Sequence, residues 1–428
     1  RNTTSFAATD WVELREGVTE FVGYDTTECD THILRYRKVK QKNNEFYQIV
    51  LDKTPFYAEM GGQVGDHGTL TVGDEVIEIT NTKRENNLPV HISKKLPSDV
   101  TAPVHAAIDV ELRKATECNH TATHLLHAAL RQVLGNHVEQ KGSYVSPHAL
   151  RFDFSHFKKV TQEELRDVEY VANAMVRTAT AREEYRDMNI DDARKMGAMA
   201  LFGEKYGDKV RVIKYGDSVE LCGGTHVCNT GNIGMIKITS EGSVAAGIRR
   251  IEAITGKEVE VQLNHYLDMM DQISKLYNNA PDVLVAIEKS ISENAQLRKQ
   301  TEDFFNQQIQ TVKKEVLDMA EEINGISVAI LDGLRMSEVA RGVGAAIRGE
   351  GRERTAYLAA TQEDGKPLLN VVLSDDLVKL GYNAGKMVKE AAKLIQGGGG
   401  GQPAMAQAGG RNADGLVQAL EKLKEMLQ

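Results

Sequence analysis

The sequence predicts an α+β protein of several domains: a β-rich barrel subdomain, an α+β domain, a long helical segment and a small α/β domain. The chain has 428 residues, which is more than one hydrophobic core usually organises. Short β-patterned segments fill residues 1–95, and helix and strand patterns alternate over residues 96–256. Glycine is absent from residues 257–323, and residues 324–428 alternate strand and helix patterns again.

Residues 1–95 carry most of the strand patterns. Thr31–Lys40 and Phe46–Leu51 are rich in β-branched and aromatic residues, and Gly73-Asp74 separates two further short strands as a hairpin turn would. Many short strands with Gly-rich turns are typical of a small barrel or a sandwich, and we expect the barrel.

Residues 96–256 mix helices and strands. Asp109 is the expected N-cap of a helix whose apolar positions recur at helical spacing until Gly135. Thr161, with Glu164 three residues later, has the capping-box pattern before a second helix that should end near Ala181. Strands are expected after these helices, at Val210–Tyr215, Ser218–Leu221 and Gly234–Ser240.

Residues 257–323 should form two long helices that meet near Pro281, the only proline of this stretch. The second helix carries a hydrophobic seam with the spacing of a coiled coil, made of Phe305, Ile309, Val312, Val316, Met319 and Ile323. Such a seam suits either two helices packed on each other within one chain or a homodimer, and both interpretations stay open.

Residues 324–428 should form a small, largely independent α/β domain. A helix bearing several lysines, a Gly-rich loop at Gly397–Gly401 and a final helix at Asp414–Leu427 follow its strands. The expected strands are Ser327–Leu331, Thr355–Thr361 and Leu368–Leu373.

Composition excludes several classes of protein. Hydrophobic residues make up 41% and charged residues 26% of the chain, as in soluble globular proteins, and no apolar run is long enough for a transmembrane helix. Four cysteines are too few for a disulfide scaffold and suit a reducing compartment, so we expect a cytoplasmic protein. The net charge of −9 argues against a general nucleic-acid binder, and we expect no membrane or DNA partner. Because the chain begins with Arg1 rather than Met and no apolar segment follows, we expect no signal peptide and a piece of a longer protein.

Two pairs of residues carry the sharpest chemical signal. His120 and His124 lie four residues apart, so both imidazoles project from one face of the expected helix. Cys222 and His226 flank Gly-Gly-Thr, and the glycines allow a sharp turn that would bring both side chains to one point. Three imidazoles and one thiolate suit Zn²⁺, so we predict one zinc ion per chain. Four protein ligands are typical of a structural zinc, whereas a weak ligand or a fifth position would make it catalytic, and the spacing leaves both open.

Other residues of the same chemistry have plainer interpretations. His127, on the same helical face, is expected to support the ligands or to fill the core. Cys118 and Cys228 are expected to be buried small hydrophobic residues, and the sequence reveals no partner for Cys29.

The two pairs resemble those of alanyl-tRNA synthetases and of related free-standing alanyl editing proteins. The segment from Phe56 to Gly68 is similar to the family pattern FYAExGGQxGDxG, with Met60 where the family often has Ser. Three further stretches resemble family sequence: Ala200–Asp208, Gly247–Ala253 and the tail from Gly397 to Gly410. The resemblance covers essentially the whole chain and implies the C-terminal portion of a bacterial-type enzyme, without the ATP-dependent core that attaches alanine to tRNA.

The resemblance implies an editing reaction. In this family the editing site hydrolyses the ester that links a wrong serine or glycine to tRNA(Ala). Gln140 matches a family residue linked to editing, and its amide would hydrogen-bond the amino acid or the terminal ribose. The zinc ligands implied by the resemblance are His120, His124, Cys222 and His226.

Basic residues give two candidate tRNA contacts. Arg249 and Arg250 follow a Gly-rich turn and would meet phosphates near the acceptor end, with a solvated strand end as the alternative. Lys386, Lys389 and Lys393 fall on one helical face beside the Gly-rich loop, whose backbone N–H groups can hold an anion. The tail resembles the tRNA-binding tail of the synthetases. It has no Walker A or Asp-His-His motif, so we do not expect it to hydrolyse nucleotides.

Two functions of different classes follow. The first is hydrolysis of mischarged seryl- or glycyl-tRNA(Ala) by a module that also binds tRNA(Ala). The second is a tRNA-binding and dimerisation module whose zinc is structural and which has no hydrolytic activity of its own. A free-standing editing protein fits the long helical segment and tail less well, and the editing domain of threonyl-tRNA synthetases lacks such a tail.

Overall fold

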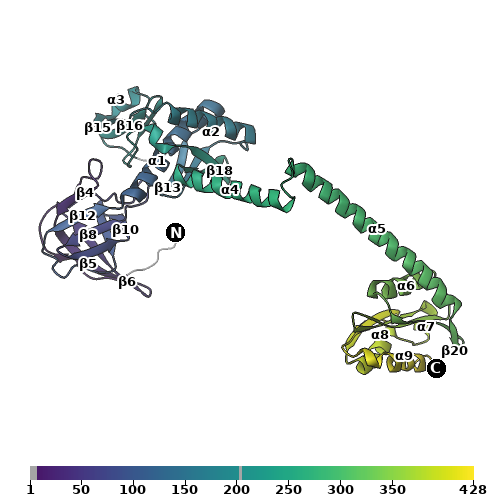
Figure 1. The fold of residues 1–428 in the computed structure, drawn as a ribbon. Helices are drawn as coiled ribbons and strands as arrows, with labels where there is room; N and C mark the ends of the chain where they lie inside the picture. The colour runs from purple at the N-terminus through teal and green to yellow at the C-terminus, as the bar shows by residue number, and fades with distance from the viewer. Residues whose placement is uncertain (1–6, 202–204) are drawn as a thin grey trace. The chain divides into compact units, whose positions relative to one another are not determined.

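The computed structural model describes residues 7–201 and 205–428 (Figure 1). The chain forms two compact units, the first ending at Asp271 and the second running over Gln272–Gln428. Within the described residues, no helix is long and apolar enough to cross a membrane.

The first unit begins with two open sheets that share one core. One sheet has the order β1-β5-β6-β11-β10, with β2 on β5, and the other has the order β4-β12-β8-β9. Their strands are β1 (Ala7–Ala8), β2 (Val12–Glu13), β5 (Ile33–Gln41), β6 (Asn44–Leu51), β10 (Asn81–Glu85), β11 (Leu88–Ser93), β4 (Glu28–Thr31), β8 (Gly68–Val72), β9 (Glu75–Ile79) and β12 (Val104–Ile108). A short pair, β3 (Glu20–Phe21) and β7 (Lys53–Thr54), lies beside them.

The barrel prediction is wrong in this form. Within the described residues, neither sheet pairs its edge strands with the other, so the strands do not close into a ring. Side chains of both sheets, such as Ile49 and Leu70, fill one core between them. The second sheet also contains β12, which lies beyond residue 95.

The rest of the first unit is α+β, as the cap signals predict. Helix α1 (Val110–Leu134) starts where the Asp109 side chain accepts a hydrogen bond from the Leu112 N–H, and it ends at Gly135. Helix α2 (Gln162–Arg177) starts with the Thr161–Glu164 capping box. Both helices pack against the sheet of order β13-β14-β19-β18, whose strands are β13 (Gln140–Val145), β14 (Leu150–Ser155), β19 (Ile248–Thr255) and β18 (Ile236–Ala245).

A smaller sheet completes the first unit and carries the second ligand pair. It has the order β15-β16-β17, with β15 (Glu183–Asn189), β16 (Lys209–Tyr215) and β17 (Ser218–Leu221), and the short helix α3 (Ile190–Lys195) follows β15. The 3-10 turn Thr230–Ile233 joins this sheet to β18.

Helices α4 (Lys257–Leu276) and α5 (Val283–Asp318) lie on either side of Pro281, as the sequence predicts. The predicted seam is only partly helical, because α5 ends at Asp318 and Ile323 lies in strand β20 (Glu321–Ile323). Val312 and Val316 are buried in the core of the second unit's own sheet, with Phe305 and Ile309 packed beside them. This end of the seam is therefore occupied within the chain.

The second unit is a six-stranded sheet with helices on both faces. Its order is β20-β21-β22-β23-β25-β24, and only β21 and β22 are parallel. The further strands are β21 (Ile326–Leu334), β22 (Thr355–Glu363), β23 (Lys366–Leu373), β25 (Met405–Gly409) and β24 (Gly398–Gln402). Helix α6 (Ser337–Gly349) and the end of α5 cover one face. Helices α8 (Ala384–Ala392) and α9 (Leu416–Glu425) cover the other, and the short α7 (Asp375–Lys379) precedes α8.

The prediction of a Gly-rich loop at Gly397–Gly401 is wrong, because most of this segment forms the edge strand β24, which pairs with β25. Glycine is required by close approach rather than by a loop: a Cβ on Gly401 would lie 2.5 Å from the Met405 carbonyl oxygen, and one on Gly399 would overlap the backbone of β25. Runs of glycine lack the side chains that mark strands, so the pattern predicts a loop where backbone contact selects a strand.

A candidate metal centre beside a cavity

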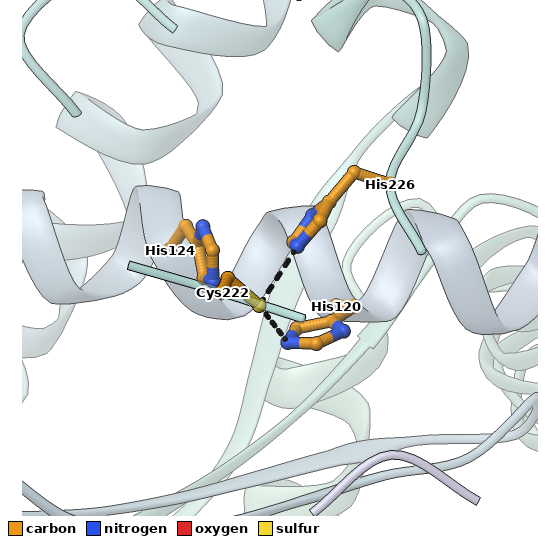
Figure 2. Close-up of side chains that lie close together, drawn as sticks. All are labelled: His120, His124, Cys222 and His226. Carbon is orange, nitrogen blue, oxygen red and sulfur yellow. Dashed lines mark hydrogen bonds between the residues drawn. The ribbon is translucent and has the colours of Figure 1, made fainter. Parts of the chain in front are cut away.

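Two elements of the first unit bring four metal-binding side chains together (Figure 2). Helix α1 presents His120 and His124 one turn apart on its buried face. Strand β17 ends at Leu221, and the turn after it carries Cys222 and His226 toward the helix. The three imidazoles and the thiol point at one another, as the sequence spacing predicts.

The distances fit one metal ion. The nearest ligand atoms of the four residues all lie within 4.8 Å of one another. Cys222 Sγ is 3.4 Å from His120 Nε2 and 3.3 Å from His226 Nε2. Ligands about 2.0–2.3 Å from a tetrahedral ion stand about 3.5 Å apart, so this spacing needs little adjustment to hold a metal.

Each imidazole is oriented from behind by a polar partner. His120 Nδ1 lies 2.7 Å from Gln63 Oε1, and His226 Nδ1 lies 2.9 Å from the Thr121 hydroxyl. His124 Nδ1 lies 2.9 Å from a carboxylate oxygen of Glu220, without the alignment of a good hydrogen bond. Such partners fix the ring orientation and leave Nε2 for the metal.

The turn between the ligands is itself held in place. A Cβ on Gly224 would overlap the His120 ring and lie 2.7 Å from Gln63 Oε1, so only glycine lets the ligand and its partner pass. Arg211 donates from Nη1 to the carbonyls of Cys222 and Gly224, at 2.8 and 2.6 Å, and its Nε donates to Glu184. The turn is thus fixed from the next strand.

The electrostatics favour a thiolate at Cys222 and a neutral imidazole at His226. At His124, burial would lower the pKa, but the Glu220 carboxylate and the Cys222 sulfur outweigh burial and raise the pKa to about 10. Burial alone would raise the pKa of the Cys222 thiol, but His120 and His226 outweigh it and hold that pKa well below its usual range. Burial, with His120 and His124 nearby, lowers the pKa of His226. Burial would raise the pKa of Glu220, yet His124 and His127 hold it well below its usual range. A thiolate and neutral imidazoles are the forms that bind metal ions.

The ligands form part of the wall of a cavity of about 270 Å³. His120, His124 and Cys222 line it together with Gln140, and Met60 stands at the same wall with 40% of its surface exposed. Further lining residues include Tyr57, Thr123, Ser143, Tyr206, Lys209 and Arg211. The cluster therefore opens onto space that a small polar group can enter.

Comparisons with known proteins place the chain in a family. Residues 210–252 match the model of the threonyl and alanyl tRNA synthetase second additional domain, residues 2–112 that of class II (A) tRNA synthetases, and residues 324–428 that of the DHHA1 domain. Alanine–tRNA ligases of Bacteroides fragilis, Porphyromonas gingivalis and Flavobacterium psychrophilum are 57%, 51% and 44% identical to it, over 98–100% of this chain. The chain belongs to the alanine–tRNA ligase family.

The chain spans about half the length of these relatives, 48–49% of each, and corresponds to a C-terminal portion of the ligase. Among solved structures, the C-Ala domain of the Aquifex aeolicus alanyl-tRNA synthetase matches 25% of this chain and 96% of that domain, at 24% identity. Its TM-score of 0.24 is too low for the likeness to carry an argument.

Two arginines that the sequence singled out do not line the cavity. Arg249 is paired with Glu241, and Arg250 makes a bidentate pair with Asp153 at 2.7 and 2.9 Å. Phosphate contact by either arginine would thus compete with a carboxylate.

Lys386, Lys389 and Lys393 are exposed at α8 in the second unit, and Lys393 pairs with Glu390 at 2.9 Å. A Cβ on Gly400 would lie 3.5 Å from Lys389 Cε, so the basic face and the glycine strand are neighbours. Their tRNA-binding role stays a prediction.

Of the remaining candidates, His127 lies 2.7 Å from Glu220 and so supports the carboxylate behind His124. The prediction that Cys118 and Cys228 are buried is wrong, since Cys228 is exposed and Cys118 only partly buried. Both sit beside the 3-10 turn after β17 and contact Asn232.

Sequence reasoning missed the polar partners behind the ligands. The sequence offered one indication of Glu220, which is its position two residues before Cys222 in a predicted strand. The structure shows that this strand is fully buried. Gln63 lies in the family-like FYAExGGQxGD segment, but nothing in its spacing places it 57 residues away against His120. Thr121 is one residue from a ligand and has no signal of its own.

Proposed function

We propose that this chain hydrolyses seryl- and glycyl-tRNA(Ala), with one zinc ion held by His120, His124, Cys222 and His226. The observation that carries the proposal is the position of the cluster in a cavity wall, because a purely structural ion needs no adjacent space. The family assignment supports it, since a matched domain belongs to threonyl and alanyl synthetases.

The need for such a reaction is physical. An activation pocket built for alanine cannot strongly reject glycine, which is smaller, or serine, which adds one hydroxyl. A second site that removes the wrong product restores accuracy. The parent ligase would attach alanine to tRNA(Ala) with ATP, and the present chain would correct its errors.

Each residue of the cavity would have its own role in hydrolysis. Zinc in this position would supply a Lewis acid for the ester carbonyl or lower the pKa of water. Gln140 lines the same cavity, and its amide can hydrogen-bond the amino acid or the terminal ribose. Gln63 and Thr121 keep the imidazole nitrogens facing the metal. Met60 at the wall offers no hydroxyl for the substrate.

A second function has one observation in its favour. Four protein ligands complete a tetrahedral shell, which is typical of a structural zinc. The chain would then be a tRNA-binding and dimerisation module without hydrolysis. Under both functions, strand β24 and the exposed lysines of α8 would contact tRNA(Ala). A reduced Cys222 is consistent with the cytoplasm.

Single-turnover deacylation separates the two functions. Seryl-tRNA(Ala) and alanyl-tRNA(Ala) are mixed with an excess of the chain or of its Cys222→Ala or Gln140→Ala variant. Zinc content and circular dichroism are recorded for each protein. We expect rapid release of serine but not alanine, and a loss of about 100-fold or more in both variants. If the zinc-loaded chain binds tRNA and releases no serine, the structural alternative holds.

A further inference from the structure

The turn after β14 presents an aromatic ring to solvent beside two lysines. Phe157 is 91% exposed, more than any other large hydrophobic residue of the described chain. Lys158 and Lys159 follow it and are also exposed, and no carboxylate of the described residues lies within ion-pair distance of either. A lone exposed apolar residue needs no explanation, but a fully exposed ring flanked by unpaired cations is an unusual combination.

The turn is built to hold the ring outward. His156 donates its backbone N–H to the Gly247 carbonyl at 3.0 Å, and His137 Nε2 lies 2.8 Å from His156 Nδ1 beneath it. A Cβ on Gly247 would lie 3.0 Å from Phe157 Cε1, so the glycine makes room for the edge of the ring. The ring is thus placed by its neighbours while most of its surface stays free.

The same turn lies at the cavity end of its sheet. Gln140 pairs with Phe154 in neighbouring strands, and the Ser155 N–H donates to the Glu139 carbonyl at 3.1 Å. Phe157 follows Phe154 by three residues, and because β14 ends at Ser155 the two residues are at most about 10 Å apart. That distance corresponds to about 3 stacked nucleotides. A strand of RNA whose last residue reaches Gln140 can therefore pass over Phe157.

The local charge is suited to a phosphate backbone. Lys158 and Lys159 precede the N-terminus of α2, whose dipole also favours anions. Glu164 in the first turn of that helix is used by the capping box, where it accepts from the Thr161 N–H at 3.2 Å. Glu163 is the other acidic residue of that first helical turn, so the two carboxylates lie on the helix while the two cations lie in the turn beside Phe157.

We propose that Phe157 is a stacking platform for a base in the single-stranded 3′ end of tRNA, with Lys158 and Lys159 contacting the adjacent phosphates. Stacking on an exposed aromatic ring is tolerant of sequence and suits a strand end that all tRNAs share. The inference rests on the proposed function in one respect, that the chain receives the 3′ end of a tRNA.

The test is binding of a short uncharged RNA ending in CCA, in which 2-aminopurine replaces one of the three nucleotides before the terminal adenosine. We expect the full zinc-loaded chain to quench the fluorescence, Phe157→Ala to lose the quenching and about tenfold in affinity, and Phe157→Trp to keep both. Tyr170→Ala is the matched control, because Tyr170 is 72% exposed on α2 and should not matter. Replacing Lys158 and Lys159 by Ala should lower the salt dependence of log K by about 1.4.

Hydrolysis separates this proposal from the editing function. Phe157→Ala should slow release of serine from subsaturating seryl-tRNA(Ala) and leave seryl-adenosine, which is too short to reach the ring, unaffected. If the wild type hydrolyses neither ester but its RNA binding depends on Phe157, editing is refuted and the platform stands. If Phe157→Ala binds and quenches the RNA as the wild type does, the platform is refuted, whatever the hydrolysis shows.

Discussion

The two units differ in where they keep their charged and titratable groups. In the described chain, every buried Asp, Glu, Arg or His side chain lies in the first unit, where Asp66, Arg113, His91 and Glu220 are all less than 9% exposed. The buried polar residues of the second unit are only Thr355, Thr361 and Asn370, while its candidate lysines stand on the surface. A buried polar network costs stability unless every group is paired, so its presence indicates chemistry, whereas exposed lysines indicate binding by charge.

The buried Asp66–Arg113 pair should give the largest effect on stability. Arg113 Nε donates to both Asp66 oxygens, at 2.9 and 3.1 Å, and its other nitrogens donate to the Gly23 and Pro55 carbonyls. Arg113→Ala would leave a buried carboxylate unpaired and should cost the first unit about 3–5 kcal/mol. Denaturant unfolding measures this cost. Lys38→Ala breaks an exposed pair with Glu45 of similar length, 2.9 Å, and should leave the unfolding free energy almost unchanged, because solvent screens this pair. Equal losses would contradict the contrast.

Substitution of two adjacent glycines should give the second-largest effect, a change in metal affinity. Gly224→Ala would push a methyl group into the His120 ring, and we expect metal affinity to fall by about 100-fold or more. Gly223→Ala is the matched control, because its Cβ would meet only the flexible end of Met60, at 3.1 Å, and the Tyr24 hydroxyl, at 3.9 Å. Competition with a chromogenic chelator measures both affinities. If the two variants bind zinc equally well, the turn does not position His120 as described.

The same glycines show what sequence spacing can predict. His120 and His124 were predictable because helical periodicity fixes which side chains share a face, and the Asp109 and Gly135 caps fixed the helix. Cys222 and His226 were predictable as a pair, since Gly-Gly allows the turn. Their meeting with α1 was an inference from chemistry, and the distances agree with it.

The partners behind the ligands were beyond such reasoning. Gln63 reaches His120 because the Asp66–Arg113 pair fastens its loop to α1 and Thr225 holds its amide, and these long-range contacts leave no periodic pattern in the sequence. The glycine strand β24 was missed for a related reason, because backbone approach between strands has no side-chain pattern. Periodicity records which face is buried, and it does not record which distant segment covers that face.

A buried histidine gives the first unit a pH dependence that the second should lack. His91 donates from Nδ1 to the Ile49 carbonyl and accepts from the Thr54 hydroxyl, and burial lowers its pKa from 6.5 to about 4. The unfolded chain therefore binds a proton near pH 6.5 that the folded chain refuses until about pH 4. The His91 contribution to stability should be full above pH 6.5 and fall by about 2–3 kcal/mol as the pH drops to 4, while Glu117, whose pKa burial raises to about 7, acts in the opposite direction.

His91→Gln removes this proton and should flatten the dependence over that window, measured by urea unfolding at several pH values. His105→Gln is the control, because the exposed His105 pairs with Asp30 and Glu28 and its pKa is raised, not lowered. A slope unchanged by His91→Gln would mean that other groups carry the acid sensitivity.

The exposed lysines of the second unit should give the smallest effect for each residue and no effect on folding. Replacing Lys386, Lys389 and Lys393 together by Ala removes three cations that no buried group depends on, so the melting temperature should stay within about 2 °C. If all three contact phosphates, the slope of log K for tRNA binding against log salt should fall by about 2.7, and metal content should not change. Lys422→Ala on α9 is the control, because Lys422 lies outside the α8 face and pairs with Glu425. Because charge contacts of this kind are nearly additive and salt-sensitive, a loss of tRNA affinity that persists unchanged at high salt would show that α8 acts through packing, and the division between a chemical unit and a charged binding unit would then fail.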